Sequence, residues 1–314
     1  MADAARPPLA AVSVDLDEIH HYHRIHGLPA HTPTGPGAHA VYDVAMGRIA
    51  DFARALAIPV DLFAVGDDLD RPESAAALAR MVQAGHLVEN HSRSHRYDLG
   101  RASTAEIAAE VVAGAHAIAR VTGRRPLGFR APGYTVSDGL FDALEDAGVR
   151  FDSSVFPCPS YWAAKAAVMA SLRVRGRRSA SILDTPRMLG APIGPYRPGR
   201  PYWRRGQRGL VELPIQVDPF SRLPLIGTSI GLVGERAARM FARACVRLPM
   251  VNLELHGIDF LETADGIDDL RRLQPEVARP LATRLAAFAA FVDELRRAGR
   301  TFVPLAEAAS AFDD

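Results

Sequence analysis

Short apolar runs alternate with longer segments of helical periodicity along most of this sequence. The runs are rich in β-branched residues and end at Gly, Pro or polar residues, which is typical of buried strands. Strands are predicted at residues 10–14, 59–65, 86–90, 127–130, 149–154, 210–217, 250–255 and 300–305. In the segments between them, apolar residues recur at the spacing of one helix face. Helices are predicted at residues 41–57, 72–84, 104–121, 137–147, 235–247 and 275–298.

The order of these elements indicates the fold class. Strands that alternate with helices form a parallel sheet with the helices outside it. About seven or eight such units favour an α/β fold of the (β/α) barrel type, with an open doubly wound sheet as the alternative. The rhythm is lost at about residues 159–209, which are rich in Pro, Gly and Arg and are predicted to form an irregular insertion. We expect residues 1–314 to form a single domain that carries this insertion.

The composition is that of an ordinary globular protein and excludes several functional classes. The chain is 48% hydrophobic and 23% charged, and its net charge of +1 argues against a dedicated nucleic-acid binder. Cys158 and Cys245 are too few for a cysteine zinc site, and both are expected to be reduced. The N-terminus lacks a signal-peptide pattern, and no apolar run approaches the ~20 residues of a membrane helix. We therefore expect a cytoplasmic protein without a transmembrane segment.

The side chains best suited to chemistry follow the predicted strands. Two aspartates come after the first strand, two histidines after the third, and single residues at the fourth, the fifth and the strand at 250–255. In chain order they are Asp15, Asp17, His91, His95, Arg130, Asp152 and His256. Active sites of (β/α) barrels lie where the strands end, so these residues are predicted to share one rim.

Two imidazoles and a carboxylate at this rim predict a metal centre. His91 and His95 can share a face if the chain turns after its strand, and this donor set suits zinc and similar divalent ions. Asp15 and Asp17 are two positions apart, so their side chains point the same way from an extended segment. One can bind the metal while the other serves as a base. Arg130 can pair with the free carboxylate and fix its position.

The residue His256 reaches the same rim from another part of the chain. It could protonate a leaving group as a general acid, or it could stabilise an oxyanion. Carboxylates commonly orient catalytic imidazoles, and Asp152 is the candidate for that role.

Five short motifs occur in the order that one known family shows. They read SVDLDE, NHSRSH, FRAPGY, FDSSVFP and NLELHG, and they run from Ser13 to the segment around His256. With these motifs the chain resembles the polysaccharide deacetylases of the NodB-homology type, carbohydrate esterase family four. The resemblance implies a distorted (β/α) barrel and a metal-dependent amide hydrolysis that removes an N-acetyl group from an amino sugar.

The resemblance also implies a role for each motif residue. Asp17, His91 and His95 would be the metal ligands, Asp15 the base, His256 the acid, Arg130 and Asp152 their respective partners, and Tyr134 a neighbour of the acyl pocket. Zinc is the expected metal, with Co²⁺, Ni²⁺ and Mn²⁺ as alternatives.

The chain departs from the common family pattern in three respects. Leu16 separates the two aspartates, a form that is similar to the branch acting on lipid-linked or small substrates. Val155 and Phe156 stand where the fourth motif often carries a tryptophan. The absence of a signal-peptide pattern makes a cytoplasmic precursor a more natural substrate than a cell-wall polymer.

Other candidate substrate contacts lie outside the motifs. The cluster from His20 to His26 is expected to be mostly a loop at the mouth of the pocket, with His20 or His23 touching substrate. Trp203 lies in the arginine-rich part of the insertion, which is either a solvated basic loop or a clamp for a phosphate-bearing sugar. The apolar segment at residues 224–234 either packs in the core or contacts a lipid tail at a membrane surface.

These observations together predict a metal-dependent carbohydrate de-N-acetylase in which an Asp base and a His acid serve a metal-activated water. The expected partner is an amino-sugar-containing small molecule, or a lipid- or nucleotide-linked precursor. One alternative is a deformylase or a non-sugar amidohydrolase that uses the same site. Another is a catalytically silent carbohydrate-binding barrel. The sequence leaves the oligomeric state open.

Overall fold

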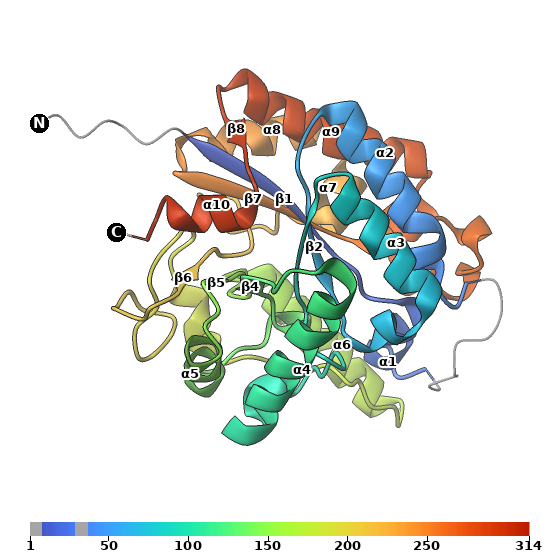
Figure 1. The fold of residues 1–314 in the computed structure, drawn as a ribbon. Coiled ribbons are helices and arrows are strands. Elements are labelled where there is room, and N and C mark those ends of the chain that lie inside the picture. Colours follow the sequence, from blue (N-terminus) through green and yellow to red (C-terminus); the bar gives the residue numbers. More distant parts are fainter. Residues whose placement is uncertain (1–7, 29–36, 314) are drawn as a thin grey trace, which may run out of the picture.

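A computed structural model describes residues 8–28 and 37–313 of the chain (Figure 1). Outside this range lie residues 1–7, part of the N-terminus that lacks a signal-peptide pattern, and residues 29–36 of the loop expected after Asp17.

The described residues form one parallel sheet that curls into a half-barrel. The strand order is β6-β5-β4-β3-β2-β1-β7, and β8 pairs with the start of β1. The strands are β1 Leu9–Asp15, β2 Asp61–Ala64, β3 Leu87–Asn90, β4 Gly128–Phe129, β5 Phe151–Asp152, β6 Val211–Glu212, β7 Met250–His256 and β8 Thr301–Phe302. An isolated bridge from Ile226 to Glu254 brings the irregular chain after β6 against β7. The predicted barrel-type fold is confirmed, and the open doubly wound alternative is not what forms.

Helices cover the outside of the sheet. They are α1 Ile19–Ile25, α2 Met46–Leu56, α3 Pro72–Gln83, α4 Thr104–Thr122, α5 Asp138–Asp146, α6 Pro159–Val174, α7 Gly227–Val233, α8 Glu235–Ala244, α9 Leu281–Arg297 and α10 Leu305–Ser310. Helix α4 begins with a capping box between Ser103 and Glu106 and ends at Gly123, whose φ of 70° suits a residue without a side chain. In Figure 1, α2, α3 and α9 lie on one side of the molecule, and α4 and α5 lie below the shorter strands.

Three expectations about local structure are wrong. The helix α1 forms where a histidine-rich loop was expected, and α6 forms inside the segment expected to be irregular. The long helix expected at 275–298 is divided, because Pro280 disfavours helical backbone at Arg279, whose φ and ψ are −84° and 142°. By contrast, the apolar segment at 224–234 forms helix α7 and buries Ile230 in the core, which is one of the two alternatives for this segment.

The apolar side of the sheet and helices forms the core. Within this core the ring of Phe52 packs edge to face against Phe260 and against Phe288. Aromatic side chains such as these bury large apolar areas. Cys158 and Cys245 are free and buried. Of the helices in the described residues, none combines the length and the hydrophobicity that a membrane span requires.

Candidate active site

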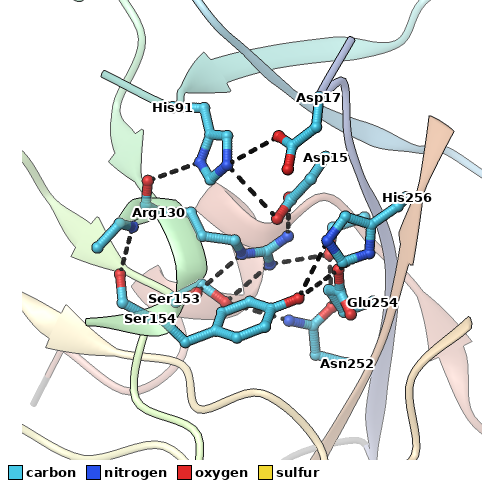
Figure 2. Close-up of polar contacts among 12 residues, drawn as sticks. Asp15, Asp17, His91, Arg130, Ser153, Ser154, Asn252, Glu254 and His256 are labelled. Atoms are coloured by element: carbon cyan, nitrogen blue, oxygen red, sulfur yellow. Dashed lines mark hydrogen bonds and ion pairs between the residues drawn. The ribbon is translucent and has the colours of Figure 1, made fainter. Parts of the chain in front are cut away.

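Three ligand-type side chains converge at the carboxyl ends of β1 and β3. Asp17 lies two residues beyond β1, and its Oδ1 is 3.1 Å from Nε2 of His91 and 3.1 Å from Nε2 of His95. All three side chains are buried (Figure 2 shows Asp17 and His91). The expected turn after the third strand therefore forms, and it brings the two imidazoles to one carboxylate.

Local backbone geometry directs both histidines toward Asp17. His91 Nδ1 lies 2.8 Å from the carbonyl oxygen of Arg130, and because a carbonyl can only accept, Nδ1 carries the proton and donates it. The lone pair of His91 is therefore on Nε2, which faces Asp17. His95 has a φ of 52°, a left-handed conformation that is rare for a residue with a side chain. Its backbone N–H donates to Ser92 Oγ at 3.1 Å, which helps to hold that conformation.

Helix α4 supports the loop that carries the two histidines. The Glu110 carboxylate accepts hydrogen bonds from the backbone N–H groups of Arg93 and Ser94 at 3.2 and 2.9 Å. Asn90 donates to the carbonyl of Val111 at 2.8 Å. A side chain at Gly114 would place its Cβ 2.4 Å from Asn90 Oδ1, so this position requires a glycine. These contacts hold the loop at a fixed distance from the helix.

The second aspartate, Asp15, pairs most closely with Arg130, and its other oxygen lies 3.8 Å from Nε2 of His91. Arg130 Nη1 is 2.5 Å from Asp15 Oδ1, and neither side chain is more than 1% exposed. The guanidinium also donates to Ser13 Oγ at 2.9 Å and to Ser153 Oγ at 2.9 Å, and Figure 2 shows the contact with Ser153. Burial raises the pKa of Asp15, and Arg130 and His91 partly offset this effect. A carboxylate with a raised pKa is a better base than a solvated one.

On the other side of Asp15 lies His256, the register partner of that residue in the pairing of β1 with β7. Its Nδ1 is 3.0 Å from Glu254 Oε1, and the Tyr134 hydroxyl donates to the same oxygen at 2.9 Å. Burial lowers the pKa of His256, but the carboxylates of Glu254, Asp15 and Asp17 together outweigh burial and raise the pKa well above 6.5. The imidazole is therefore protonated at neutral pH, and its Nε2 is the group that can donate a proton.

The expectation that Asp152 orients His256 is wrong. Ser154 Oγ donates to Asp152 Oδ1 at 2.8 Å, and the Asp152 side chain shares a hydrogen bond with Glu212 on the neighbouring strand. Burial raises the pKa of Asp152 to about 6. The carboxylate beside His256 is Glu254, because β7 pairs directly with β1 whereas β5 lies on the far side of β4.

Sequence reasoning missed Glu254, although a signal for it exists. In β7 the polar residues Asn252, Glu254 and His256 alternate with apolar ones, so they point to the same face of the sheet. The amide of Asn252 donates to Ser153 Oγ at 3.2 Å and so joins the Arg130 network.

The candidate substrate contacts lie at different distances from this centre. Tyr134 is part of it: its hydroxyl is 3.4 Å from His256 Nε2. His23 pairs with Asp269 at 2.8 Å, and His20 stacks on His21. Trp203 lines a separate cavity of about 570 Å³ together with residues of the segment after Tyr134 and with Leu183–Pro186.

Comparison with known proteins agrees with these features. A family model described as polysaccharide deacetylase matches residues 41–151. The structure of a candidate polysaccharide deacetylase from Mycobacterium smegmatis superimposes with a TM-score of 0.57 at 18% identity, over 99% of this chain and 93% of that one. The predicted resemblance to the polysaccharide deacetylases is confirmed. The likeness to the mycobacterial structure is one of fold.

Two further solved structures give lower scores. A family 4 carbohydrate esterase from Streptomyces lividans, in complex with acetate, is 14% identical over 98% of this chain and 97% of its own, with a TM-score of 0.48. A family 4 pseudoenzyme from Bacillus anthracis is 11% identical over 95% of this chain and 63% of its own, with a TM-score of 0.47. Comparison with curated protein sequences finds no match.

Proposed function

We propose that this protein is a metal-dependent hydrolase that removes an N-acyl group, in the simplest case N-acetyl, from an amino sugar or glycoconjugate precursor. One juxtaposition carries the proposal. The triad of Asp17, His91 and His95 lies beside two groups of opposite proton-transfer character, Asp15 with its arginine and His256 with its glutamate. Amide hydrolysis needs such a set, because one proton must leave the attacking water and another must reach the departing nitrogen.

The triad fits a divalent metal ion. Asp17 Oδ1, His91 Nε2 and His95 Nε2 are buried, and apart from their 3.1 Å contacts with one another they have no hydrogen-bond partner among the described residues. Two imidazole nitrogens and a carboxylate oxygen are a recurring donor set for catalytic zinc and for Co²⁺ or Ni²⁺. When bound there, such an ion would polarise a carbonyl group and make water more acidic.

The remaining residues have roles that follow from their contacts. Asp15 would accept the proton of the attacking water, and Arg130 would hold that carboxylate in place. The water oxygen would form a bond to the carbonyl carbon, and the bond between that carbon and the nitrogen would then break. His256 would donate its Nε2 proton to that nitrogen, so that the products are a carboxylate and a free amine. The Tyr134 hydroxyl lies beside the same Nε2 and would confine the leaving group.

Product release from defined amides tests the proposal. The zinc- or cobalt-loaded protein is incubated with N-acetyl and N-formyl amino sugars, free and lipid- or nucleotide-linked, and the released acid is identified. Asp15→Asn should reduce turnover by about 10²-fold or more. Asp61→Asn is the matched control, because Asp61 is equally buried but lies at the start of β2 and accepts its hydrogen bond from the backbone N–H of Leu305.

The possible outcomes separate the alternatives. Release of formate alone would favour a deformylase, and release from non-sugar amides a broader amidohydrolase. Metal binding together with sugar binding, but without release of any acid, would contradict the proposal and favour a silent carbohydrate-binding barrel.

A further inference from the structure

A second group of ligand-type side chains lies next to the proposed active site. His20 and His21 belong to α1, and Asp68 belongs to the short 3-10 helix Asp67–Asp70 that follows β2. Each of the three offers one ligand atom, and these atoms lie within 4.8 Å of one another. None of the three belongs to the triad of Asp17, His91 and His95.

The polar atoms of this second group lack partners. His20 Nδ1, both ring nitrogens of His21 and Asp68 Oδ2 are shielded from solvent and have no hydrogen-bond partner among the described residues. The His21 side chain is only 2% exposed. Buried imidazole and carboxylate groups are normally hydrogen-bonded, so three such groups that face one another indicate that something else satisfies them.

The charges around Asp68 favour a cation. Burial raises the pKa of this carboxyl, and the neighbouring charges that add to the effect are those of Glu18, Asp17 and Asp67, all negative. No arginine or lysine among the described residues offsets the negative charge on Asp68.

The second group is held rigidly against the first. The ring of His21 packs on that of His95 with 4.1 Å between their centroids. The chain before Asp68 is tied to the histidine loop, since the Gly66 N–H donates to the carbonyl of Ser92 at 3.0 Å. Both groups therefore lie at the carboxyl ends of β1, β2 and β3, and the second group forms without a rearrangement of the first.

We propose that His20, His21 and Asp68 form a second divalent-cation site, of the class that binds Zn²⁺ or Co²⁺. Two imidazoles and one carboxylate are the same borderline donor set as in the first triad. A cation there links α1 to the turn after β2 and neutralises the buried carboxylate. This inference goes beyond the proposed hydrolase function and does not depend on it.

The stoichiometry of cobalt binding tests the proposal. The full-length protein is stripped with a chelator and dialysed against Co²⁺ alone, and bound cobalt is counted and followed by its visible absorption. The wild type should bind two ions per chain. Asp68→Asn should bind one, His91→Ala should bind one, and the double variant none. His23→Ala is the matched control. It removes an imidazole from the same helix, but this imidazole pairs with Asp269, so the variant should still bind two cobalt ions.

The outcomes distinguish the two sites. One ion in the wild type, one in Asp68→Asn and none in His91→Ala would overturn the second site and leave the proposed active site intact. An unchanged count in His91→Ala would contradict the first site instead. Circular dichroism confirms that each variant is folded. If Asp68→Asn does not fold, His20→Gln replaces it, since His20 is partly exposed. Two ions bound by folded His20→Gln would also overturn the proposal.

Discussion

The ion pair between Glu254 and His256 offers the sharpest test of the proposed acid. Replacement of Glu254 by Gln keeps the size of the side chain and an oxygen that can accept a hydrogen bond, but it removes the charge. The two charged groups are 3.0 Å apart and Glu254 is fully buried. At an effective dielectric constant of about 20, Coulomb's law gives roughly 5 kcal/mol for charges at this separation, which is an upper limit of about four pKa units.

The expected change is smaller than that limit. The carboxylate of Asp15 remains near His256 in the variant and continues to raise the pKa of the imidazole. We therefore expect Glu254→Gln to lower the pKa of His256 by about 1 to 3 units, the range found for an opposite charge at close contact. Since one unit is a factor of ten, the protonated fraction at pH 8 would fall substantially.

The pKa can be measured without a substrate. Nuclear magnetic resonance of ¹⁵N-histidine-labelled, metal-free protein follows each imidazole with pH, and His256→Asn assigns the signal. Asp152→Asn is the control, because it removes an equally buried carboxylate. The sequence placed this carboxylate beside His256, whereas in the structure it accepts a hydrogen bond from Ser154. An unchanged midpoint in Glu254→Gln, or an equal shift in Asp152→Asn, would refute the assignment. With an active substrate, the alkaline limb of the rate profile should move to lower pH by the same amount.

Three other predictions follow from the same region. Gly114→Ala should destabilise the protein by about 1–3 kcal/mol in urea unfolding and weaken cobalt binding, because the new Cβ would be 2.4 Å from Asn90 Oδ1. Gly47→Ala, where a Cβ meets nothing within 4 Å, should be neutral or stabilising, and an equal loss in both would contradict the argument. Arg130→Ala should cost about 3–5 kcal/mol of stability because it leaves Asp15 charged and buried, and the cost should shrink in an Asp15→Asn background. Because the imidazole of the ion pair has a raised pKa, its contribution to stability is complete below about pH 6.5 and is lost as pH rises through the raised value. The difference in unfolding free energy between the wild type and the Gln variant should therefore be larger at pH 6 than at pH 10.

Local patterns in the sequence determined the strands and helices and the residues that lie at the ends of the strands. Each predicted strand forms, and the helices at 72–84, 104–121 and 137–147 end within a residue or so of their predicted ends. The reason is that periodicity and caps act over a few residues and are written directly into the chain. The histidine-rich helix α1 was missed because seven residues with few apolar positions carry little periodic signal. Its helical form is set by contacts with the rest of the fold.

Contacts between distant residues decided how the side chains at the rim divide their roles. The sequence left open which aspartate would face the histidines, and it placed Asp152 beside His256. The structure brings Asp17 to the two imidazoles and Asp15 to Arg130, and it places Glu254 on His256. Strand order and register make these choices, because β1 pairs with β7 although the paired residues are 241 positions apart, whereas three strands lie between β1 and β5.

The sequence by itself therefore determined which residue types reach the end of the sheet, since parallel strands place their carboxyl ends at one edge. Only the tertiary structure decided which of them touch. It also decided that His20 and His21 face Asp68, a residue almost 50 positions further along the chain that no motif connects to them. Pairing of this kind depends on the direction of each side chain and on the packing of α1 against the turn after β2, and neither is encoded in a local pattern of hydrophobic and polar positions.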